Sequence, residues 1–199
     1  VDELQDSSGN LIIKEVGNTI TIGESGDTTN IVGTLQNNGA ALIGGITQAD
    51  QWRLSANLNT NAQIITSNLE RNDTSYEKIG TGMSESSGVF TFPATGVYRI
   101  DFNILWVANG DGDIRYAGGE IQYSNDDFSS SGILAESYNG CNNHGLNYYM
   151  GAHCCAFFDV DDLSNDKIKF RVTASATIDC VGSTTANYTN MTFTRLGDT

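Results

Sequence analysis

The segment from residue 86 to residue 107, SSGVFTFPATGVYRIDFNILWV, alternates apolar and polar side chains over most of its length. A two-residue period predicts β-strands with one face in a core and the other in a wetter environment. Pro93, the only proline in the chain, ends the first of two strands, and PATG makes the turn between them. The core face of the second strand is predicted to hold Tyr98, Ile100, Phe102, Ile104 and Trp106.

Five more strands are predicted after this pair, and turn-like segments rich in Gly, Asn, Asp and Ser separate them. No helical periodicity lies between the strands, so the pattern predicts an all-β sandwich or jelly roll. The five strands are expected at Ile114–Ser124, Gly132–Tyr138, Tyr148–Val160, Lys167–Ala176 and Asn187–Leu196.

The first 50 residues have a different pattern, with short apolar bursts at roughly ten-residue spacing. The bursts are too sparse to close a core within one chain, so we expect a β-rich stalk in which several copies pool their apolar residues. A flexible, partly ordered tail is the alternative. The expected organisation is a stalk or attachment segment over residues 1–50, a junction over 51–61 and a head domain over 62–199.

Composition and charge narrow the classes of partner. The formal net charge is −14, and binding to nucleic acid requires clustered Lys and Arg, so we expect no nucleic-acid partner. No apolar run reaches the ~18–20 residues that cross a bilayer, so no membrane insertion is expected. No signal peptide is visible from Val1 onward.

The four cysteines, Cys141, Cys154, Cys155 and Cys180, lack the spacing of a zinc site. A disulfide that joins Cys141 or Cys180 to one of the adjacent pair stays open, because the redox compartment is unknown.

Catalytic chemistry finds little support in the sequence. The chain has two histidines, His144 in a loop and His153 beside Cys154 in a predicted strand. Neighbours along a strand point to opposite faces, so His153 and Cys154 are not expected to share a proton as base and nucleophile. We therefore expect no enzymatic activity.

A calcium site is the one cofactor that the sequence suggests. Asp111 and Asp113 alternate in the loop segment DGD, and Ca²⁺ takes six to eight oxygen ligands. The same composition is common in solvated turns, which is the alternative.

The segment SSGVFTFPATGVYRIDFNI resembles the signature of the C1q/tumour-necrosis-factor-like jelly-roll family, Gly-x-Phe-Thr-x-Pro-x-x-Gly-x-Tyr-x-x-x-(aromatic). Downstream, CCAFFDVDDLSNDKIKFRV and ANYTNMTFTRL are similar to later strands of that family, in the expected order. The resemblance covers residues 62–199 and implies a jelly-roll head that forms a homotrimer and binds receptors, sugars or other proteins. The signature positions are filled by Gly88, Phe90, Thr91, Pro93, Gly96, Tyr98 and Phe102.

The resemblance also suggests where binding surfaces lie. In such a trimer Leu105, Val107 and Phe157 are expected to meet their copies around the threefold axis. The loop and strand ends over residues 136–149 combine rings and amides that suit contact with a host glycan or protein. The residues expected to make this contact are Tyr138, Asn142, Asn143, His144 and Tyr148. The alternative for these tyrosines is packing between protomers.

A second resemblance spans more of the chain. The segments TITIGESGDTTNIVGTLQNNGA and ADQWRLSANLNTNAQIITSNLERND, together with the terminal FTRLGDT, are similar to structural proteins of marine tailed bacteriophages. This implies a fibre or decoration protein on the virion exterior, with capsid or tail proteins as partners of the N-terminal segment. The alternatives are a secreted or cell-surface C1q-like lectin or adhesin of a bacterium, and an enzyme such as a capsule depolymerase. For the enzyme, the sequence offers no persuasive pair of acids.

Overall fold

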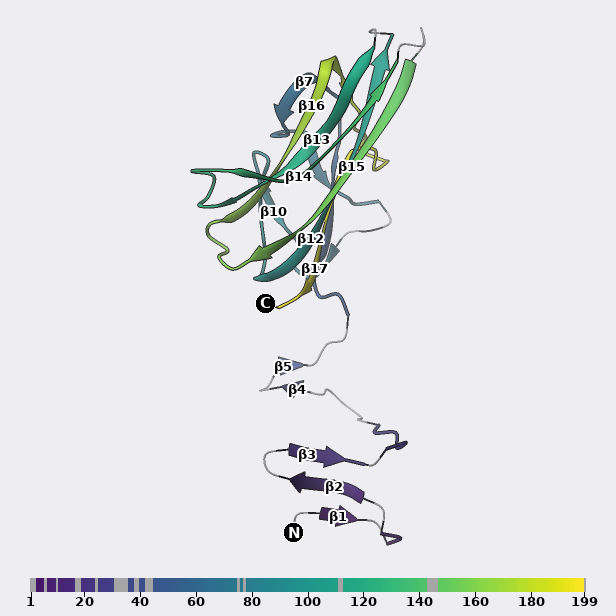
Figure 1. The fold of residues 1–199 in the computed structure, drawn as a ribbon, viewed down its shortest axis with the longest axis vertical. Helices are drawn as coiled ribbons and strands as arrows, with labels where there is room; N and C mark the ends of the chain where they lie inside the picture. Colours follow the sequence, from purple (N-terminus) through teal and green to yellow (C-terminus); the bar gives the residue numbers. More distant parts are fainter. Residues whose placement is uncertain are drawn as a thin grey trace. The chain divides into compact units, whose positions relative to one another are not determined.

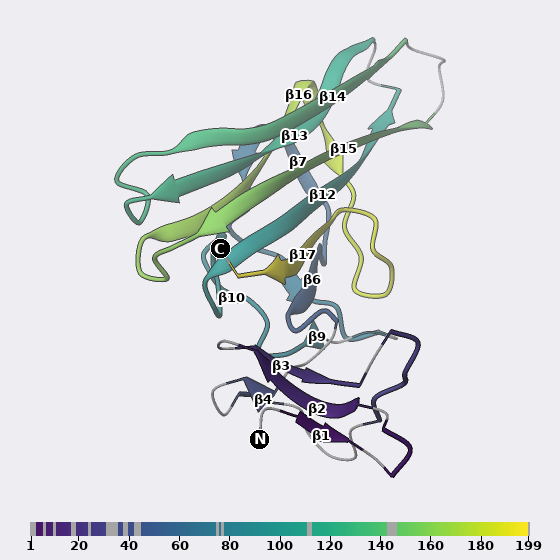
Figure 2. The ribbon, with the colours of Figure 1, turned by 60° about the horizontal axis from the view of Figure 1, so that its bottom comes forward.

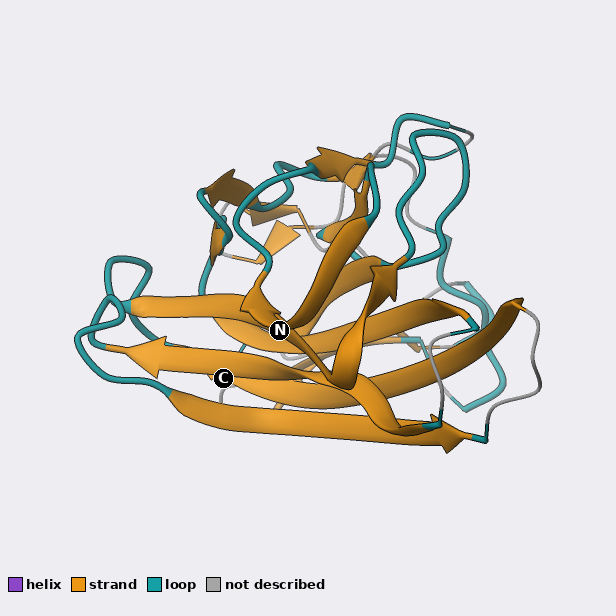
Figure 3. Cartoon of the chain, turned by 90° about the horizontal axis from the view of Figure 1, so that it is seen from above, coloured by secondary structure: helices purple, strands orange, loops and turns teal. Residues whose placement is uncertain are grey.

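The computed structural model consists of strands, turns and loops, and its described residues contain no helix (Figure 3). No membrane-spanning helix is therefore found among them. The chain divides into two compact units, Val1–Gly44 and Gly45–Thr199. The structure describes residues 3–5, 7–9, 11–16, 19–23, 25–30, 36–37, 40–41, 45–74, 76, 78–110, 113–142 and 147–198.

The N-terminal unit contains a small antiparallel sheet in the order β1-β2-β3, formed by Glu3–Gln5, Leu11–Val16 and Thr19–Ile22 (Figure 1). A separate two-residue pairing joins β4 (Gln36–Asn37) to β5 (Ala40–Ala41). The expected β-rich character of this segment is present, on strands of two to six residues.

The second unit, hereafter the head, is built from twelve antiparallel strands. One layer pairs β15, β12, β17 and β6 in that order, with β8 and β9 beside β6. The other layer pairs β14, β13 and β16, with β7 and β11 beside β16 and β10 beside β11. The two layers join where β12 meets β16 at Trp106 and Cys180. Figure 2 shows the long antiparallel pairs, β12 with β15 and β13 with β14.

The bounds of the head strands agree closely with the alternating segments of the sequence from residue 96 onward. The strands are β6 (Ala49–Leu54), β7 (Leu58–Ile64), β8 (Leu69–Arg71), β9 (Lys78–Ile79), β10 (Ser84–Ser86), β11 (Val89–Thr91), β12 (Gly96–Asn109), β13 (Ile114–Asn125), β14 (Gly132–Cys141), β15 (Asn147–Val160), β16 (Asp166–Cys180) and β17 (Asn190–Gly197).

The core lies between the two layers and is rich in aromatic rings. All five predicted core positions of β12 are buried, from Tyr98 to Trp106. Phe170 of β16 packs against Phe102 of β12 with ring centroids 4.9 Å apart, and against Phe90 of β11 at 5.4 Å. Burial of each such side chain contributes about 1.5–3 kcal/mol, and tilted or edge-on ring pairs add to it.

The head begins earlier in the chain than the sequence predicted. The expected junction over residues 51–61 holds most of β6 and the start of β7, which pair with β17 and β16. The predicted boundary at residue 62 therefore falls inside the head unit. The alternation is hard to see here because β6 carries two charged residues, Asp50 and Arg53, whose side chains are both almost fully buried.

Ion pairs and hydrogen bonds compensate these two buried charges. Arg53 pairs with Glu70 and Asp73, the latter at 2.7 Å. Asp50 pairs with Arg71 at 3.0 Å and accepts hydrogen bonds from the Trp52 indole at 3.0 Å and from the Met83 amide at 2.7 Å. A buried charge is tolerated only when it is paired in this way, so the network fixes β6 in the head despite its polar sequence.

Candidate functional site

Strand β12 has a second face, which points away from the core. The register with β15 places Phe157 beside Arg99, Cys155 beside Asp101, and His153 beside Asn103. Further along, Gly151 lies beside Leu105, and Tyr149 lies beside Val107. Strand β17 continues the surface with Thr194, Thr192 and Asn190. We call this surface the outward face, defined by the non-core residues of β12, β15 and β17.

Large aromatic side chains are uncovered on the outward face. Phe157 is 63% exposed and Tyr149 is 65% exposed, and Leu105 between them along the strands is half-buried. Tyr188, in the loop before β17, is exposed as well. Beside it lies an open groove of about 410 Å³ that is lined by Asn103, Ile104, Leu105, Gly151, Ala152, His153, Asn187 and Tyr188. The face thus offers apolar surface that nothing in a single chain covers among the described residues.

A polar cluster lies between these aromatic residues. The Arg99 guanidinium donates two hydrogen bonds to the Asp101 carboxylate, at 2.8 and 2.9 Å, and His153 Nε2 lies 3.1 Å from Asp101 Oδ1. Burial works against ionisation of Asp101, but the hydrogen bonds from Arg99 and His153 hold the pKa of its carboxyl below its usual range. The Asp101 carboxylate is therefore ionised, and its neighbours Arg99 and His153 satisfy it by hydrogen bonds.

The two adjacent thiols are poor nucleophiles. Burial, followed by the negative charge of Asp101, raises the pKa of the Cys155 thiol. Burial raises the pKa of Cys154 to about 12. Cys154 points into the core while His153 points outward, so the two side chains lie on opposite faces as the strand pattern predicted. A reactive thiolate requires a lowered pKa, and neither residue has one.

For Val107, one of the three residues expected at a trimer axis, the predicted outward position is wrong. Val107 is only 8% exposed, because it sits where β12 meets both Tyr149 of β15 and Asp179 of β16. Its own chain already covers it, so it needs no second copy. Leu105 and Phe157 do point away from the core, and their contact with other copies stays a prediction.

Two of the residues predicted for host contact, Tyr138 and Tyr148, do not share one surface. Tyr138 lies on the other layer and is exposed, with its ring edge-on to Tyr116 at 5.9 Å and its hydroxyl 3.3 Å from Glu136. Tyr148 was wrongly predicted as a surface residue. It is 8% exposed and belongs to the core, because Tyr149 takes the outward position of that doublet.

Of the other three residues predicted for host contact, only Asn142 is among the residues that the structure describes. Asn142 is exposed, and Asn143 and His144 lie outside the described residues. A contact surface that combines Tyr138 with the loop residues therefore stays a prediction without Tyr148.

The predicted calcium site is only partly within the described residues. Asp113 is exposed, and Asp111 lies outside the description. Among the residues that the structure does describe, no group of three or more His, Cys, Asp or Glu side chains is arranged to hold a metal ion. The calcium site stays a prediction.

Cys154, Cys155 and Cys180 are free thiols. None of the predicted disulfides with these three residues is therefore formed.

The N-terminal sheet carries a second uncovered apolar surface. Leu4 of β1, Ile13 of β2 and Ile22 of β3 are directly paired in register, so they form a row across one face of the sheet. All three side chains are exposed, and Ile20 on the same face of β3 is exposed too. We call these three residues the aliphatic row. The neighbouring register positions are Glu3, Lys14 and Thr21.

Two features of the surface had little signal in the sequence. Tyr188 lies in a loop, where no period tells outward from inward. A hollow beside the turn between β13 and β14 depends on the shape of that turn, and no motif marks it. The exposure of Tyr149 could be predicted from the sequence, because the alternation that ends in Phe158 and Val160 assigns odd-numbered residues of β15 to the outward side.

Comparison with known proteins bears on the fold. No protein-family model matches the chain, and no curated protein matches it. Among solved structures, murine APRIL at pH 5.0 matches with a TM-score of 0.54 at 13% identity, over 75% of this chain and 99% of that chain. The structure of Eiger TNF from S. frugiperda matches with a TM-score of 0.54 at 10% identity, over 78% of this chain and 96% of that chain. At this identity the likeness shows the fold alone, and it confirms the predicted all-β head with a C1q/tumour-necrosis-factor-like jelly-roll fold.

Proposed function

We propose that the chain is a structural protein of a bacteriophage particle, a homotrimeric fibre or decoration protein on the virion exterior. In this proposal the head supplies the trimer contacts and a surface that contacts the host. The N-terminal segment supplies a stalk and the attachment to capsid or tail proteins. The mechanism is assembly and adhesion without covalent chemistry.

The outward face is the observation that carries the trimer. Phe157 and Tyr149 are large rings left in water on a flat strand surface, and covering each would contribute about 1.5–3 kcal/mol. Aromatic residues are enriched in the cores of protein interfaces. A charge that an interface buries is tolerated when it is paired, as Asp101 is with Arg99. A ring of three copies is the assembly that the family resemblance implies.

The phage context is supported by the second sequence resemblance and by the nature of the N-terminal unit. Its small sheet exposes the aliphatic row, which suits a segment that is covered by other chains. Stable disulfides would favour the secreted lectin or adhesin, and the three free thiols give that alternative no support.

The trimer is tested by the mass of the full chain in solution, measured by light scattering. We expect about 64 kDa, which is three times the 21.4 kDa of one chain. Phe157→Asp is expected to give 21.4 kDa monomers, because it places a charge in the proposed interface. Ile133→Asp is the matched control, since Ile133 is an exposed apolar residue on β14, away from the outward face, and this variant should remain trimeric. A monomeric wild-type chain would refute the trimer.

The location is tested separately by mass spectrometry of purified particles of the phage that encodes the chain. We expect peptides from both units, and we expect an antibody against the head to bind intact particles. Absence of the chain from the particles would reject the virion role, whatever its oligomeric state.

A further inference from the structure

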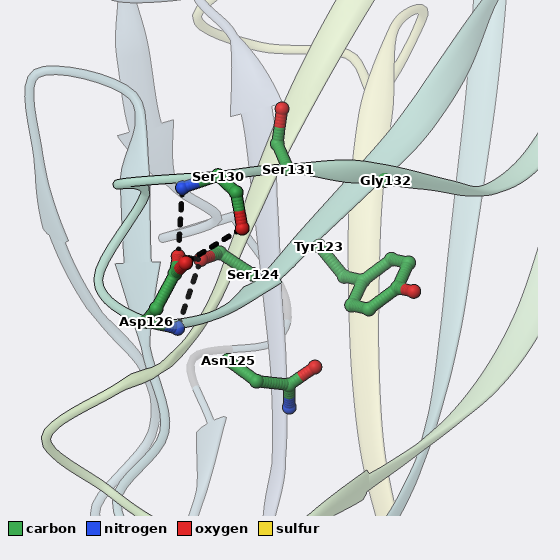
Figure 4. A pocket seen from close by; sticks show the side chains of 7 residues that line it. All are labelled: Tyr123, Ser124, Asn125, Asp126, Ser130, Ser131 and Gly132. Carbon is green, nitrogen blue, oxygen red and sulfur yellow. Dashed lines mark hydrogen bonds between the residues drawn. The ribbon is translucent and has the colours of Figure 1, made fainter.

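The turn between β13 and β14 encloses the hollow noted above, whose volume is about 310 Å³ (Figure 4). It lies at the end of the head where β13 ends and β14 begins. The hollow is lined by Tyr123, Ser124, Asn125, Asp126, Ser130, Ser131 and Gly132. We propose that it binds a single neutral sugar unit, so that it is the place where the head contacts a glycan.

The turn is held in a fixed shape by its own hydrogen bonds. The Ser124 hydroxyl donates to Asp126 Oδ1 at 2.7 Å and accepts from the Phe128 amide at 2.8 Å. Ser130 donates to both Asp126 oxygens, from its amide at 2.9 Å and from its hydroxyl at 2.6 Å. Figure 4 shows the bonds among Ser124, Asp126 and Ser130 on one side of the hollow. A hollow with fixed walls loses little conformational entropy when it binds a ligand.

The same turn contains backbone strain. Asp127 and Phe128 have φ values of 53° and 62°, in the left-handed region that a bulky residue such as Phe rarely adopts. Each such residue costs on the order of 1 kcal/mol or more, and strain of this kind persists where the surrounding contacts enforce it, often at binding sites. Lys169 Nζ lies 3.8 Å from the centre of the Phe128 ring, and Phe128 is not among the residues that line the hollow.

Three uncharged groups that line the hollow are available to a ligand. Among the described residues, the hydroxyls of Tyr123 and Ser131 make no hydrogen bond. The amide nitrogen of Asn125 donates to Asp166 at 2.5 Å, which leaves the amide oxygen of Asn125 as an acceptor. These groups can both donate to and accept from a ligand hydroxyl.

An aromatic ring and a glycine complete the site. The Tyr123 ring packs on Phe158 with centroids 5.7 Å apart, which fixes its position. A Cβ on Gly132 would come within 2.5 Å of Tyr123 Cε1, so only glycine at this position leaves the space beside the ring open. Aromatic rings commonly stack on the apolar C–H faces of sugars, and the hydroxyl groups of the sugar then reach the polar atoms around them.

Charge and size restrict the ligand class. None of the lining residues is Lys or Arg, and the one ionised group is the Asp126 carboxylate, so phosphate, sulfate and acidic sugars are disfavoured. A volume of about 310 Å³ is at the lower end of ligand pockets, which suits one sugar unit or the end of a glycan. The inference rests on the host-contact part of the proposed function, and it needs neither the trimer nor a particular place on the virion.

The test is saturation-transfer difference NMR on the full chain with the methyl glycosides of glucose, galactose, mannose and N-acetylglucosamine. Each is supplied at about 5 mM, because a few hydrogen bonds and one ring contact give dissociation constants in the millimolar range. We expect saturation transfer to at least one of these sugars. Gly132→Ala, which fills the space beside the ring, is expected to abolish it, and Tyr123→Phe to weaken it several-fold.

Gly197→Ala is the matched control, because a Cβ there meets nothing within 4 Å and the substitution is the same. It should leave the transfer unchanged, and near-ultraviolet circular dichroism should show that all variants keep the native packing. Absence of transfer to all four sugars would overturn the proposal. Transfer that Gly132→Ala and Tyr123→Phe leave unchanged would overturn it as well, because the sugar would then bind elsewhere. Either failure would leave the mass in solution and the presence on particles unaffected, so the virion role is tested independently.

Discussion

The head and the N-terminal sheet both consist of antiparallel strands, but the head buries most of its apolar residues and the N-terminal sheet exposes the aliphatic row. In the head, β12 buries its apolar positions between two layers, and Phe102 packs on Phe170. In the N-terminal sheet, Ile13 lies in a row with Leu4 and Ile22, and all three are exposed. Alternation therefore identifies a strand with an apolar face, but it does not say what covers that face.

The difference follows from the number of layers. The head has two layers of strands, so each layer covers the other and the core is closed within one chain. The N-terminal sheet has three short strands in one layer, and a segment of 44 residues has too little surface to bury a core by itself. The head is thus expected to be stable alone, whereas the N-terminal sheet is expected to depend on other chains.

The largest effect is expected from Phe102→Ala in the head. Phe102 is fully buried and contacts Phe170, so truncation should lower the free energy of unfolding by about 3–5 kcal/mol. Ile133→Ala removes an exposed apolar side chain of β14 and should change the free energy of unfolding by less than about 0.5 kcal/mol. Urea unfolding followed by tryptophan fluorescence measures both, and equal costs for the two variants would show that the core does not carry the stability of the head.

Most of the head could be predicted from the sequence because its long strands alternate cleanly between turns. The polar segment after Ile121 and the acidic turn after Val160 end their strands close to the predicted positions. Strand β6 could not be predicted in this way, since Asp50 and Arg53 are buried as ion pairs and break the expected pattern.

The candidate sites could be predicted from the sequence less completely than the fold, for physical reasons that differ from site to site. Val107 has the sequence pattern of an outward residue, but the joining of β12 to β16 covers it. In the Tyr148–Tyr149 doublet the residue types are identical, so only the phase of the strand tells which ring is exposed. The hollow beside Tyr123 depends on the conformation of a turn. That turn has positive φ values at Asp127 and Phe128, which the residue types there do not predict.

A second experiment sharpens the comparison by asking whether the aliphatic row is covered in the full-length protein. Lys14 is the only Lys or Arg before Arg53, so trypsin has one possible cleavage site in the N-terminal sheet. If copies of the chain cover the row, strand β2 stays closed and Lys14 is cleaved slowly. Ile13→Asn places an amide in the centre of the row and should speed the cleavage about tenfold, which corresponds to ~1.4 kcal/mol of lost protection.

Thr21→Asn is the matched control for this experiment. Thr21 pairs in register with Lys14, and its own side chain points away from the face that holds Ile20 and Ile22, so the added amide should leave the cleavage rate unchanged. Mass spectrometry of the released peptide, residues 1–14, gives the rate for all three proteins. Wild-type cleavage as fast as that of Ile13→Asn would mean that nothing covers the row, and the stalk would lose its structural basis while the head trimer remained testable by mass.

The smallest effect is expected on the outward face, which resembles the N-terminal sheet in exposing apolar side chains. Hydrogen bonds from Arg99 and His153 lower the folded-state pKa of Asp101, so its contribution to stability is present above the usual carboxyl pKa and is lost as the pH falls through the lowered value. Asp101→Asn should therefore lower the free energy of unfolding at pH 7 by at most about 1 kcal/mol, since the pairs lie near the surface. The difference between wild type and variant should shrink toward zero as the pH falls from about 5 to below the lowered pKa. If the difference in free energy of unfolding stays constant over this range, the carboxylate charge of Asp101 does not stabilise the face. The pairing of the strands alone would then determine the geometry of the polar cluster.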